Sequence, residues 1–302
     1  MTFPMPTSAA GSETCRICVG IATLGRPDQL ASMLDNLARQ TVRPDTIMIC
    51  CTKPEDVGAL ASNPHVVVIY DQPGSSRQRN AILAALPAGT DYVVFFDDDF
   101  YPDPRWLERV DAAFQQDASI VGITGHVVAD GIVGPGLSQE EALARIVGYD
   151  PAESNYIIDS FSPYGCNMAF RCKAIENIRF DERLVLYGWL EDRDFGASLR
   201  KRGGRLIKLG AAFGAHLGIK RGRVSGLKFG YSQVMNPIYI HRKSNMTTGQ
   251  VIWQVGRNVS ANLLKSLRPE PYVDRRGRLR GNLIAVGDLL RLRLTPERAA
   301  TL

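Results

Sequence analysis

Short apolar segments alternate with helix-like segments along the first two thirds of the chain. The apolar segments that are typical of buried β-strands are 17–22, 46–51, 66–70, 92–96 and 120–125. The segments with the apolar spacing of one helix face are 30–37, 78–86 and 106–114. This alternation predicts an α/β fold with a mainly parallel sheet and helices on both faces.

The pattern changes twice further along the chain. Residues 131–165 are rich in Gly, Pro and Ser, which predicts an irregular, mobile excursion. A helix closed by glycines is expected at 190–204, followed by a strand at 205–210. Beyond about residue 220 strand alternation ends, and helices are predicted at 251–267 and 282–292.

These patterns divide the chain into three parts. Residues 1–14 are expected to be a flexible leader, because they lack the basic start and apolar core of a secretion signal. Residues 15–220 are expected to form the α/β domain, and residues 221–302 a basic, mostly helical extension. No apolar run approaches the roughly 20 residues that cross a bilayer, so a cytoplasmic location is expected.

Charge is divided unevenly between the two ends of the chain. Residues 1–194 carry 15 Lys+Arg and 27 Asp+Glu, whereas residues 195–302 carry 21 and 4, so net charges of −12 and +17 combine to +5. An ordinary solvated surface mixes the two signs. The basic end therefore indicates an anionic partner, such as a membrane, a phosphate-rich ligand or nucleic acid.

The cysteines are expected to be reduced and buried. Cys15 and Cys18 form a CxxC pair, and Cys50 and Cys51 are adjacent, but both pairs lie in apolar, strand-like segments. A zinc or redox site is the alternative. It is disfavoured because the sequence contains no second CxxC or CxxH to complete a closed zinc site.

Three consecutive aspartates, Asp97, Asp98 and Asp99, follow the apolar segment 92–96. In an extended chain, Asp97 and Asp99 share one face and Asp98 takes the other. Parallel sheets bind ligands beyond the carboxyl ends of their strands, and carboxylates placed there suit Mg²⁺ or Mn²⁺. The alternative is an acidic turn that caps the next helix.

Five motifs around these aspartates resemble family 2 glycosyltransferases with the GT-A fold. The motifs are "VGIATLGRPDQLASMLDNLARQT", "GSSRQRNAIL", "VVFFDDDFYPDPRWL", "YGCNMAFRCKAI" and "FDERLVLYGWLEDRDFGASLRKRG". Their order and spacing match the family over roughly residues 15–220. The resemblance implies an inverting transfer of a sugar from a nucleotide-diphosphate sugar, with a divalent metal at the diphosphate.

The resemblance also implies a role for individual residues. The residues that match donor-binding positions are Thr23, Arg26, Arg79, Asp97 and Asp98. Asp97 and Asp99 match metal-binding positions, and His216 is a candidate third ligand. Asp192 matches the catalytic base, and Glu191 and Trp189 are expected to bind the acceptor. Because carboxylates also favour helix N-termini, a purely structural role for Glu191 and Asp192 stays open.

One family position departs from the pattern. Where relatives place the Asp that recognises the nucleotide base, this chain has "CCTKPEDV", which leaves Thr52, Lys53 or Asp56 to replace it. A UDP-sugar is the expected donor. The expected acceptor is a glycan or a polyprenyl-diphosphate-linked sugar in surface polysaccharide synthesis. The basic extension is expected to contact the anionic inner face of the cell membrane.

Three other functions compete with this one. A phosphatase or phosphotransferase using Asp97-x-Asp99 requires a small hydroxyl residue soon after the second aspartate, where Phe100 and Tyr101 stand. A nucleotidyltransferase requires a Gly-rich loop with a Lys after the first strand, which "ATLGRPDQ" does not supply. A nucleic-acid-binding role for the basic half lacks interleaved aromatic residues, and no nucleic acid partner is expected.

Overall fold

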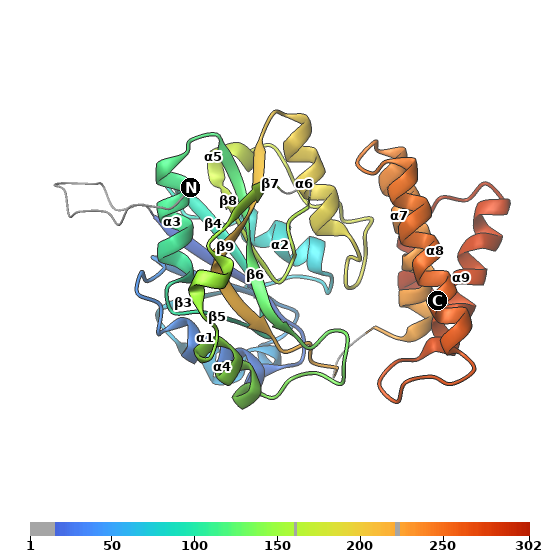
Figure 1. The fold of residues 1–302 in the computed structure, drawn as a ribbon, viewed down its shortest axis with the longest axis horizontal. Helices are drawn as coiled ribbons and strands as arrows, with labels where there is room; N and C mark the ends of the chain where they lie inside the picture. Colours follow the sequence, from blue (N-terminus) through green and yellow to red (C-terminus); the bar gives the residue numbers. More distant parts are fainter. Residues whose placement is uncertain (1–15, 160–161, 221–223) are drawn as a thin grey trace.

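The computed structural model describes residues 16–159, 162–220 and 224–302, so the predicted leader, residues 1–14, lies outside the described residues. The strands are β1 (Ile17–Ala22), β2 (Thr46–Cys51), β3 (Val66–Tyr70), β4 (Tyr92–Asp97), β5 (Phe100–Pro102), β6 (Ile120–Asp130), β7 (Ile157–Asp159), β8 (Asn167–Arg171) and β9 (Arg205–His216). The helices are α1 (Pro27–Leu37), α2 (Ser75–Ala84), α3 (Trp106–Gln116), α4 (Gln139–Val147), α5 (Cys172–Ile175), α6 (Glu191–Lys201), α7 (Gly226–Arg242), α8 (Thr248–Lys265) and α9 (Arg275–Leu290). Short 3₁₀ helices are η1 (Pro54–Asp56), η2 (Gly58–Ser62), η3 (Pro151–Ser154) and η4 (Pro296–Thr301) (Figure 1).

One half of the sheet is parallel, as the strand–helix alternation predicts. Within the described residues, a nine-stranded sheet has the order β3-β2-β1-β4-β8-β6-β9-β5, with β7 paired to β9. β3, β2, β1 and β4 run parallel to one another. β1 and β4 are buried along almost their whole length, which explains their continuous apolar sequences. Their carboxyl ends meet at one edge, where Ala22 pairs with Asp97.

The other half of the sheet is mixed. β8 lies antiparallel between β4 and β6, β9 runs parallel to β6, and β5 and β7 are antiparallel to β9. The sequence predicted β9 only as far as residue 210, but the strand continues to His216. Because β5 pairs Phe100 with His216, the end of β9 lies beside the aspartates that follow β4.

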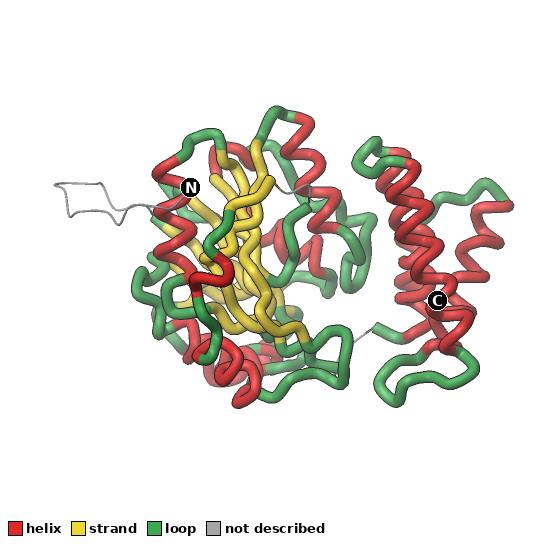
Figure 2. Tube along the Cα trace, viewed as in Figure 1, coloured by secondary structure: helices red, strands yellow, loops and turns green. Residues whose placement is uncertain are grey.

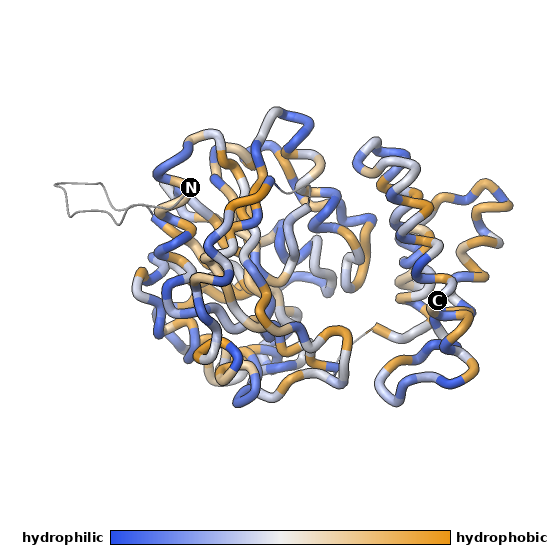
Figure 3. The backbone as a smooth tube through the Cα atoms, viewed as in Figure 1, coloured by the Kyte–Doolittle hydropathy of each residue, from blue (hydrophilic) through white to orange (hydrophobic). Residues whose placement is uncertain are grey.

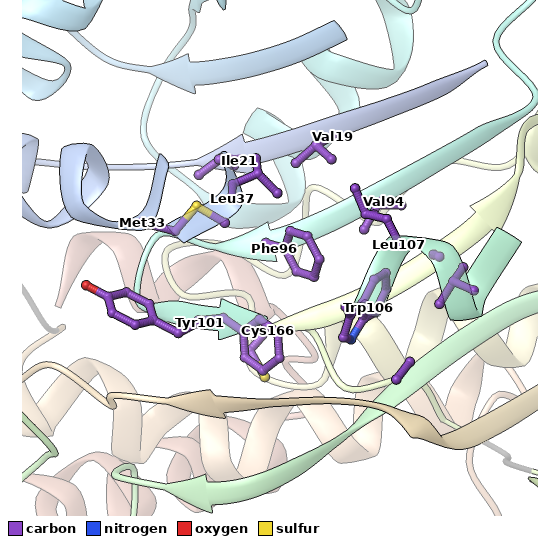
Figure 4. Packing of buried hydrophobic residues seen from close by; sticks show 14 of the residues in the cluster. Val19, Ile21, Met33, Leu37, Val94, Phe96, Tyr101, Trp106, Leu107 and Cys166 are labelled. Atoms are coloured by element: carbon purple, nitrogen blue, oxygen red, sulfur yellow. The ribbon is translucent and has the colours of Figure 1, made fainter. Parts of the chain in front are cut away.

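Helices cover both faces of the sheet through two apolar layers. One layer joins α1, α3 and α4 to the sheet and includes Val19, Phe96 and Trp106, whose side chains converge in Figure 4. The other layer joins α2 and α6 to the opposite face through Ile82 and Phe195. β4 is therefore packed from both sides, and the aspartates at its end start from a rigid strand.

Residues 131–165 contain more regular structure than their composition indicates. α4 begins after Ser138, whose hydroxyl accepts a hydrogen bond from the backbone N–H of Glu141, while the Glu141 carboxylate accepts one from the Ser138 N–H. This reciprocal capping box satisfies two backbone donors that a helix start leaves free. The prediction of an irregular excursion is wrong for α4 and for β7.

The C-terminal region is helical, as predicted (Figure 2). α8 and α9 occupy the two predicted segments but begin earlier, and α7 was not predicted. A Cβ on Gly281 of α9 would clash with the Leu227 carbonyl of α7, so glycine permits the two helices to pack closely. Among the described residues, no helix is both long and apolar enough to cross a membrane.

The cysteines in the described residues are free thiols, as the apolar sequence around them predicts. Burial raises the pKa of Cys18 and of Cys50 to about 12. Such thiols stay protonated and unreactive at neutral pH. Cys15 lies outside the described residues, so the structure leaves the CxxC pair untested.

Candidate active site

Asp98 is buried just after β4, where it contacts the loop that follows β1. Its side chain is fully buried; one carboxylate oxygen accepts a hydrogen bond from Thr23 Oγ1 at 2.7 Å and the other lies 3.0 Å from Arg26 Nη2. Burial raises the pKa of Asp98 to about 7, and the Arg26 charge acts in the opposite direction. Thr23 and Arg26, two predicted donor-binding residues, are thus fixed by a third.

Asp99 points toward the end of β9, with Arg26 Nη1 3.7 Å from its Oδ2. Its Oδ1 lies 3.3 Å from His216 Nε2, and its Oδ2 accepts a hydrogen bond from the Ile219 N–H at 2.9 Å. His216 Nδ1 lies 2.9 Å from Asp130 Oδ1. Although burial acts in the opposite direction, Asp130 and Asp99 raise the pKa of His216 to about 10, so without a metal both ring nitrogens carry a hydrogen. A metal would take the place of the hydrogen on Nε2. Asp130 therefore orients the imidazole.

Asp97, Asp99 and His216 form a cluster that fits a divalent metal. Each offers one ligand atom, and these atoms all lie within 4.8 Å of one another. Carboxylate and imidazole ligands suit Mn²⁺, and oxygen ligands suit Mg²⁺.

Arg79 links the metal cluster to the start of α6. It is 4% exposed, donates from Nη2 to Asp97 Oδ1 at 3.0 Å, and forms an ion pair with Glu191. Burial raises the pKa of Glu191 to about 8, with Arg79 acting in the opposite direction. Oε2 of Glu191 has no hydrogen-bond partner among the described residues.

Asp192 follows Glu191 in the first turn of α6. Its Oδ2 accepts a hydrogen bond from the Gly165 N–H at 2.9 Å, and its Oδ1 accepts one from the Arg193 N–H at 2.7 Å. Burial raises the pKa of Asp192, and these backbone bonds act in the opposite direction. A Cβ on Gly165 would lie 3.4 Å from Asp192 Oδ2 and 3.5 Å from Arg79 Nη2, so Gly165 forms a wall that both side chains share.

The chain enters α6 through a backbone conformation that side chains rarely adopt. Leu186, Gly188 and Leu190 have φ values of 63°, 63° and 70°. Left-handed leucines are unfavourable and persist only where the surroundings fix them. Between them, Trp189 packs edge-to-face on Phe229 of α7, with ring centroids 5.2 Å apart.

The helical region supplies those surroundings. Lys243, just after α7, donates to Asp181 Oδ2 at 2.6 Å and to Asp194 Oδ2 at 2.5 Å. Asn245 donates to Asp194 Oδ1 at 2.7 Å, and Asn236 donates to the Trp189 carbonyl at 2.9 Å. The segment 181–194 is thereby bonded to α7 and the turn after it at both ends and in the middle.

The loop expected to recognise the nucleotide base is braced by Asp56. Its side chain is fully buried and accepts hydrogen bonds from the Gly25 N–H, from the Thr52 N–H and hydroxyl, and from the Lys53 N–H. Although burial acts in the opposite direction, these bonds lower the pKa of Asp56. Its oxygens are thus engaged within the loop, whereas Lys53 is exposed.

The structure brings most predicted site residues to one edge of the sheet and adds others. Asp130, Tyr164 and Lys243 were not predicted from the sequence. Tyr164 donates to Asp130 Oδ2 at 2.8 Å and so supports the residue that orients His216. The available signal was an Asp at the end of a strand-like segment, "GHVVAD", at the same edge as the other carboxylates.

The family comparison agrees with this site. The sequence profile described as "Glycosyl transferase family 2" matches residues 18–179, which is more than half of the 302 residues. The matched part includes β4 and the aspartates that follow it, but ends before α6 and His216. No curated protein sequence matches the chain.

Solved structures are similar over nearly the whole chain. A mannosyltransferase from Pyrobaculum calidifontis, PcManGT, in complex with GDP-Man and Mn²⁺, has a TM-score of 0.55 at 14% identity, covering 98% of this chain and 86% of that one. S. aureus TarS 1–349 has a TM-score of 0.58 at 14% identity, covering 95% and 82%. GalNAc-T7 with UDP, GalNAc and Mn²⁺ has a TM-score of 0.56 at 14% identity, covering 93% and 59%. At this identity the similarity establishes the fold, and the predicted GT-A-like fold is confirmed.

Proposed function

Because the chain belongs to glycosyl transferase family 2, we propose that it transfers a sugar from a nucleotide-diphosphate sugar to an acceptor hydroxyl, with inversion at the anomeric carbon. A UDP-sugar is the favoured donor. The acceptor is a glycan or a polyprenyl-diphosphate-linked sugar, and the product belongs to a surface polysaccharide. Nucleotide ligands and Mn²⁺ in two similar structures support the donor class.

The observation that carries this proposal is the Asp97, Asp99 and His216 cluster beside the first turn of α6. In our proposal these three residues hold Mn²⁺ or Mg²⁺. A bound divalent metal neutralises the diphosphate and stabilises it as a leaving group. Thr23, Arg26 and Arg79 line the donor, while Asp98 keeps the first two in place from behind.

Asp192 is the proposed catalytic base. It accepts the proton of the acceptor hydroxyl as that oxygen bonds to the anomeric carbon and the bond from this carbon to the diphosphate breaks. The bonding electron pair leaves with the diphosphate. The raised pKa of Asp192 suits a base, because it increases affinity for the transferred proton. Glu191, with one unpartnered oxygen, and Trp189 bind the acceptor in this proposal.

The proposed location is the cytoplasmic side of the cell membrane, with the protein attached peripherally. A polyprenyl-linked acceptor is anchored in that membrane, so an enzyme bound there meets its substrate in two dimensions. The net charge of +17 on residues 195–302 supports attraction to an anionic leaflet.

Metal-dependent donor binding tests the proposal. The chain is incubated with a panel of UDP- and GDP-sugars, with and without Mn²⁺, and the free energy of unfolding and the release of nucleotide diphosphate are measured. At 100 times its dissociation constant, the correct donor should stabilise the fold by about 2.7 kcal/mol. The anomeric configuration of the product, read by NMR, tests inversion.

An Asp99→Asn variant provides the comparison, because it removes one carboxylate from the cluster. Metal-dependent stabilisation by the donor should be lost. Asp35→Asn, an exposed aspartate on α1, is the matched control and should retain it. Equal metal-dependent stabilisation in wild type and Asp99→Asn would overturn the metal assignment.

A further inference from the structure

The outer surface of α8 and α9, here called the α8–α9 face, exposes large apolar side chains. They are Ile252, Trp253, Leu263, Leu264, Leu267, Leu283, Val286, Leu290 and Leu292. Trp253 is 69% exposed, Leu264 70% and Leu290 81%. Scattered exposed apolar residues are ordinary on a protein surface, but a group of them on two helices in contact with each other is typical of an interaction site.

The spacing places these residues on one side of each helix. In α8 and the turn after it, Trp253, Leu264 and Leu267 are 11 and 3 residues apart, which is about three turns and one turn of a helix. In α9, Leu283, Val286 and Leu290 are 3 and 4 residues apart. Figure 3 shows apolar positions alternating with hydrophilic ones along these helices. The exposed apolar residues therefore form a stripe along each helix.

The opposite sides of the two helices face the inside of the bundle. Asn262 of α8 donates to Gln233 of α7 at 2.8 Å and to Asn282 of α9 at 2.9 Å, and all three side chains are buried. This polar network fixes the rotation of α8 and α9 about their axes. The apolar stripes are consequently left on the exposed sides of α8 and α9, whereas α7 and the turn after it carry the contacts to the segment 181–194.

The charges beside the stripes have one sign. Exposed basic residues on or next to them are Arg257, Lys265, Arg268, Arg276, Arg280, Arg291 and Arg293. Residues 248–293, all of which the structure describes, contain three acidic residues, and each one is engaged. Glu270 pairs with Lys265 and Arg275, Asp288 pairs with Arg298, and Asp274 accepts from the Gly277 N–H at the start of α9.

We propose that the α8–α9 face docks on an anionic membrane surface. The apolar stripes enter the boundary between headgroups and acyl chains, and the arginines lie against the anionic headgroups. A second copy of this chain would bring two basic faces together, so repulsion opposes that occupant. This inference specifies the surface behind the proposed peripheral location, and it does not depend on the donor or the reaction.

Vesicle binding by the full chain tests the inference in two independent ways. The vesicles are pure phosphatidylcholine, or equal parts of phosphatidylcholine and phosphatidylglycerol. Arg257→Gln with Arg280→Gln removes one exposed charge from each helix and should weaken binding to anionic vesicles by about thirtyfold at low salt. Trp253→Ser with Leu264→Ser should weaken it by at least about tenfold. The control is the double variant Val133→Ser with Val147→Ser, which changes two exposed apolar residues far from the face in sequence. This control should bind vesicles as wild type does.

Fluorescence provides a measurement on the unaltered face. Trp253 is the exposed member of the three tryptophans, since Trp106 is buried and Trp189 half-buried. Its emission should shift to the blue on anionic vesicles, and Trp253→Phe should remove the shift while retaining binding. The inference is overturned if wild type binds neither vesicle, or if all variants bind alike. If light scattering shows that wild type is a dimer and that the double variant Trp253→Ser with Leu264→Ser is a monomer, the face would instead be assigned to binding a second copy of the chain.

Discussion

Carboxylates of the same type take different roles in this site because their surroundings differ. Asp98 is enclosed, and burial raises its pKa to about 7. For Asp99, burial is outweighed by the hydrogen bond and charge of His216 and by the charge of Arg26, which lower its pKa to about 2. Asp99 is thus ready to bind a cation at neutral pH, whereas Asp98 organises the neighbouring loop.

The first residue-scale prediction concerns the base. Asp192→Asn should lower turnover by about 10²–10⁴ while donor affinity stays near wild type, because the donor sits against Asp97 and Asp99. The asparagine has a single acceptor oxygen, so one of the two N–H groups bonded to Asp192 loses its partner, at about 1 kcal/mol of stability. Product formation under saturating substrates and calorimetric donor binding are measured on the same protein.

The control for that variant must remove a carboxylate that lies at a helix N-terminus but has no role in the site. Asp194 is unsuitable, since it is buried and bonded to Lys243 and Asn245. Glu140, exposed in the first turn of α4, is suitable. Glu140→Gln should cost about 0.3–1 kcal/mol of stability and leave turnover unchanged. Turnover of Asp192→Asn within tenfold of wild type would move the base elsewhere.

The second residue-scale prediction concerns Asp130, which orients His216. Asp130→Asn should weaken Mn²⁺ affinity by about 10–100-fold, the usual effect of losing the partner of a ligating histidine. Tyr164→Phe removes the bond to Asp130 and a long 3.5 Å contact with His216 Nδ1 but leaves Asp130 in place, so its effect should be smaller. Metal titration by calorimetry, without donor, measures both. Wild-type affinity in Asp130→Asn would show that metal binding does not depend on the Asp130 carboxylate.

The third residue-scale prediction is a pH dependence. Because the pKa of Glu191 is raised to about 8 in the folded protein, the folded state keeps a proton that the unfolded state has lost above about pH 4.5. Stability should therefore fall as pH rises from 5 to 8 in metal-free buffer. The contribution of this group is at most about 1.4 kcal/mol for each pH unit. Glu191→Gln should flatten the profile, and Glu55→Gln, an exposed control, should not.

At the scale of elements, the sequence predicted the parts whose environment is uniform. β1, β2 and β4 are covered on both faces or nearly so, and therefore read as continuous apolar runs. β3 is the edge strand beside them and was predicted from its apolar sequence, although Val67 and Tyr70 are exposed. β5 and β8 are short, and only their pairing with β9 and β4 makes them strands. α7 was missed because it buries polar residues and contains Gly230 and Pro237, which weaken helical periodicity.

The same distinction applies to the site. Asp97, Asp98 and Asp99 were predictable because their chemistry is local, at the end of one strand. Asp130 and His216 meet across 86 positions of sequence, and Lys243 reaches Asp194 across 49. Such partners depend on strand order and helix packing, which residue spacing does not encode.

The element-scale prediction concerns Lys243, which joins α7 to the start of α6. Lys243→Met leaves Asp181 and Asp194 without their cation, which should cost about 2–3 kcal/mol of stability. Hydrogen exchange should rise in residues 184–194, where the left-handed leucines lose support. Lys265→Met, which breaks an exposed pair with Glu270, should cost under about 1 kcal/mol. Unchanged exchange in Lys243→Met would show that α6 is positioned without α7.

At the scale of the whole molecule, the helical region has two surfaces, one in contact with the α/β domain and one exposed. Its inner surface contacts the segment 181–194. These contacts include the bonds from Asn236 to Trp189 and from Lys243 to Asp181, and the ion pair of Glu297 in η4 with Arg183. Its outer surface carries the α8–α9 face. The charge asymmetry of the chain partly follows this division, because Asp97 and Asp99 lie in the acidic half and the exposed arginines of α8 and α9 in the basic half.

Removal of the residues after Pro269 separates these two roles. The truncation deletes α9 and η4, so Tyr231 loses its 2.9 Å bond to Asp288, and Asn262 loses Asn282. α7 would then hold the segment 181–194 less firmly. The melting temperature should fall, and turnover with a soluble acceptor should drop by about 10²-fold, the effect expected of a small displacement of the base. Trp253→Ser with Leu264→Ser alters only the outer surface and should leave both unchanged. Thermal unfolding and turnover are compared across the three proteins; a truncated chain that matches wild type in both would show that the site does not depend on the helical region.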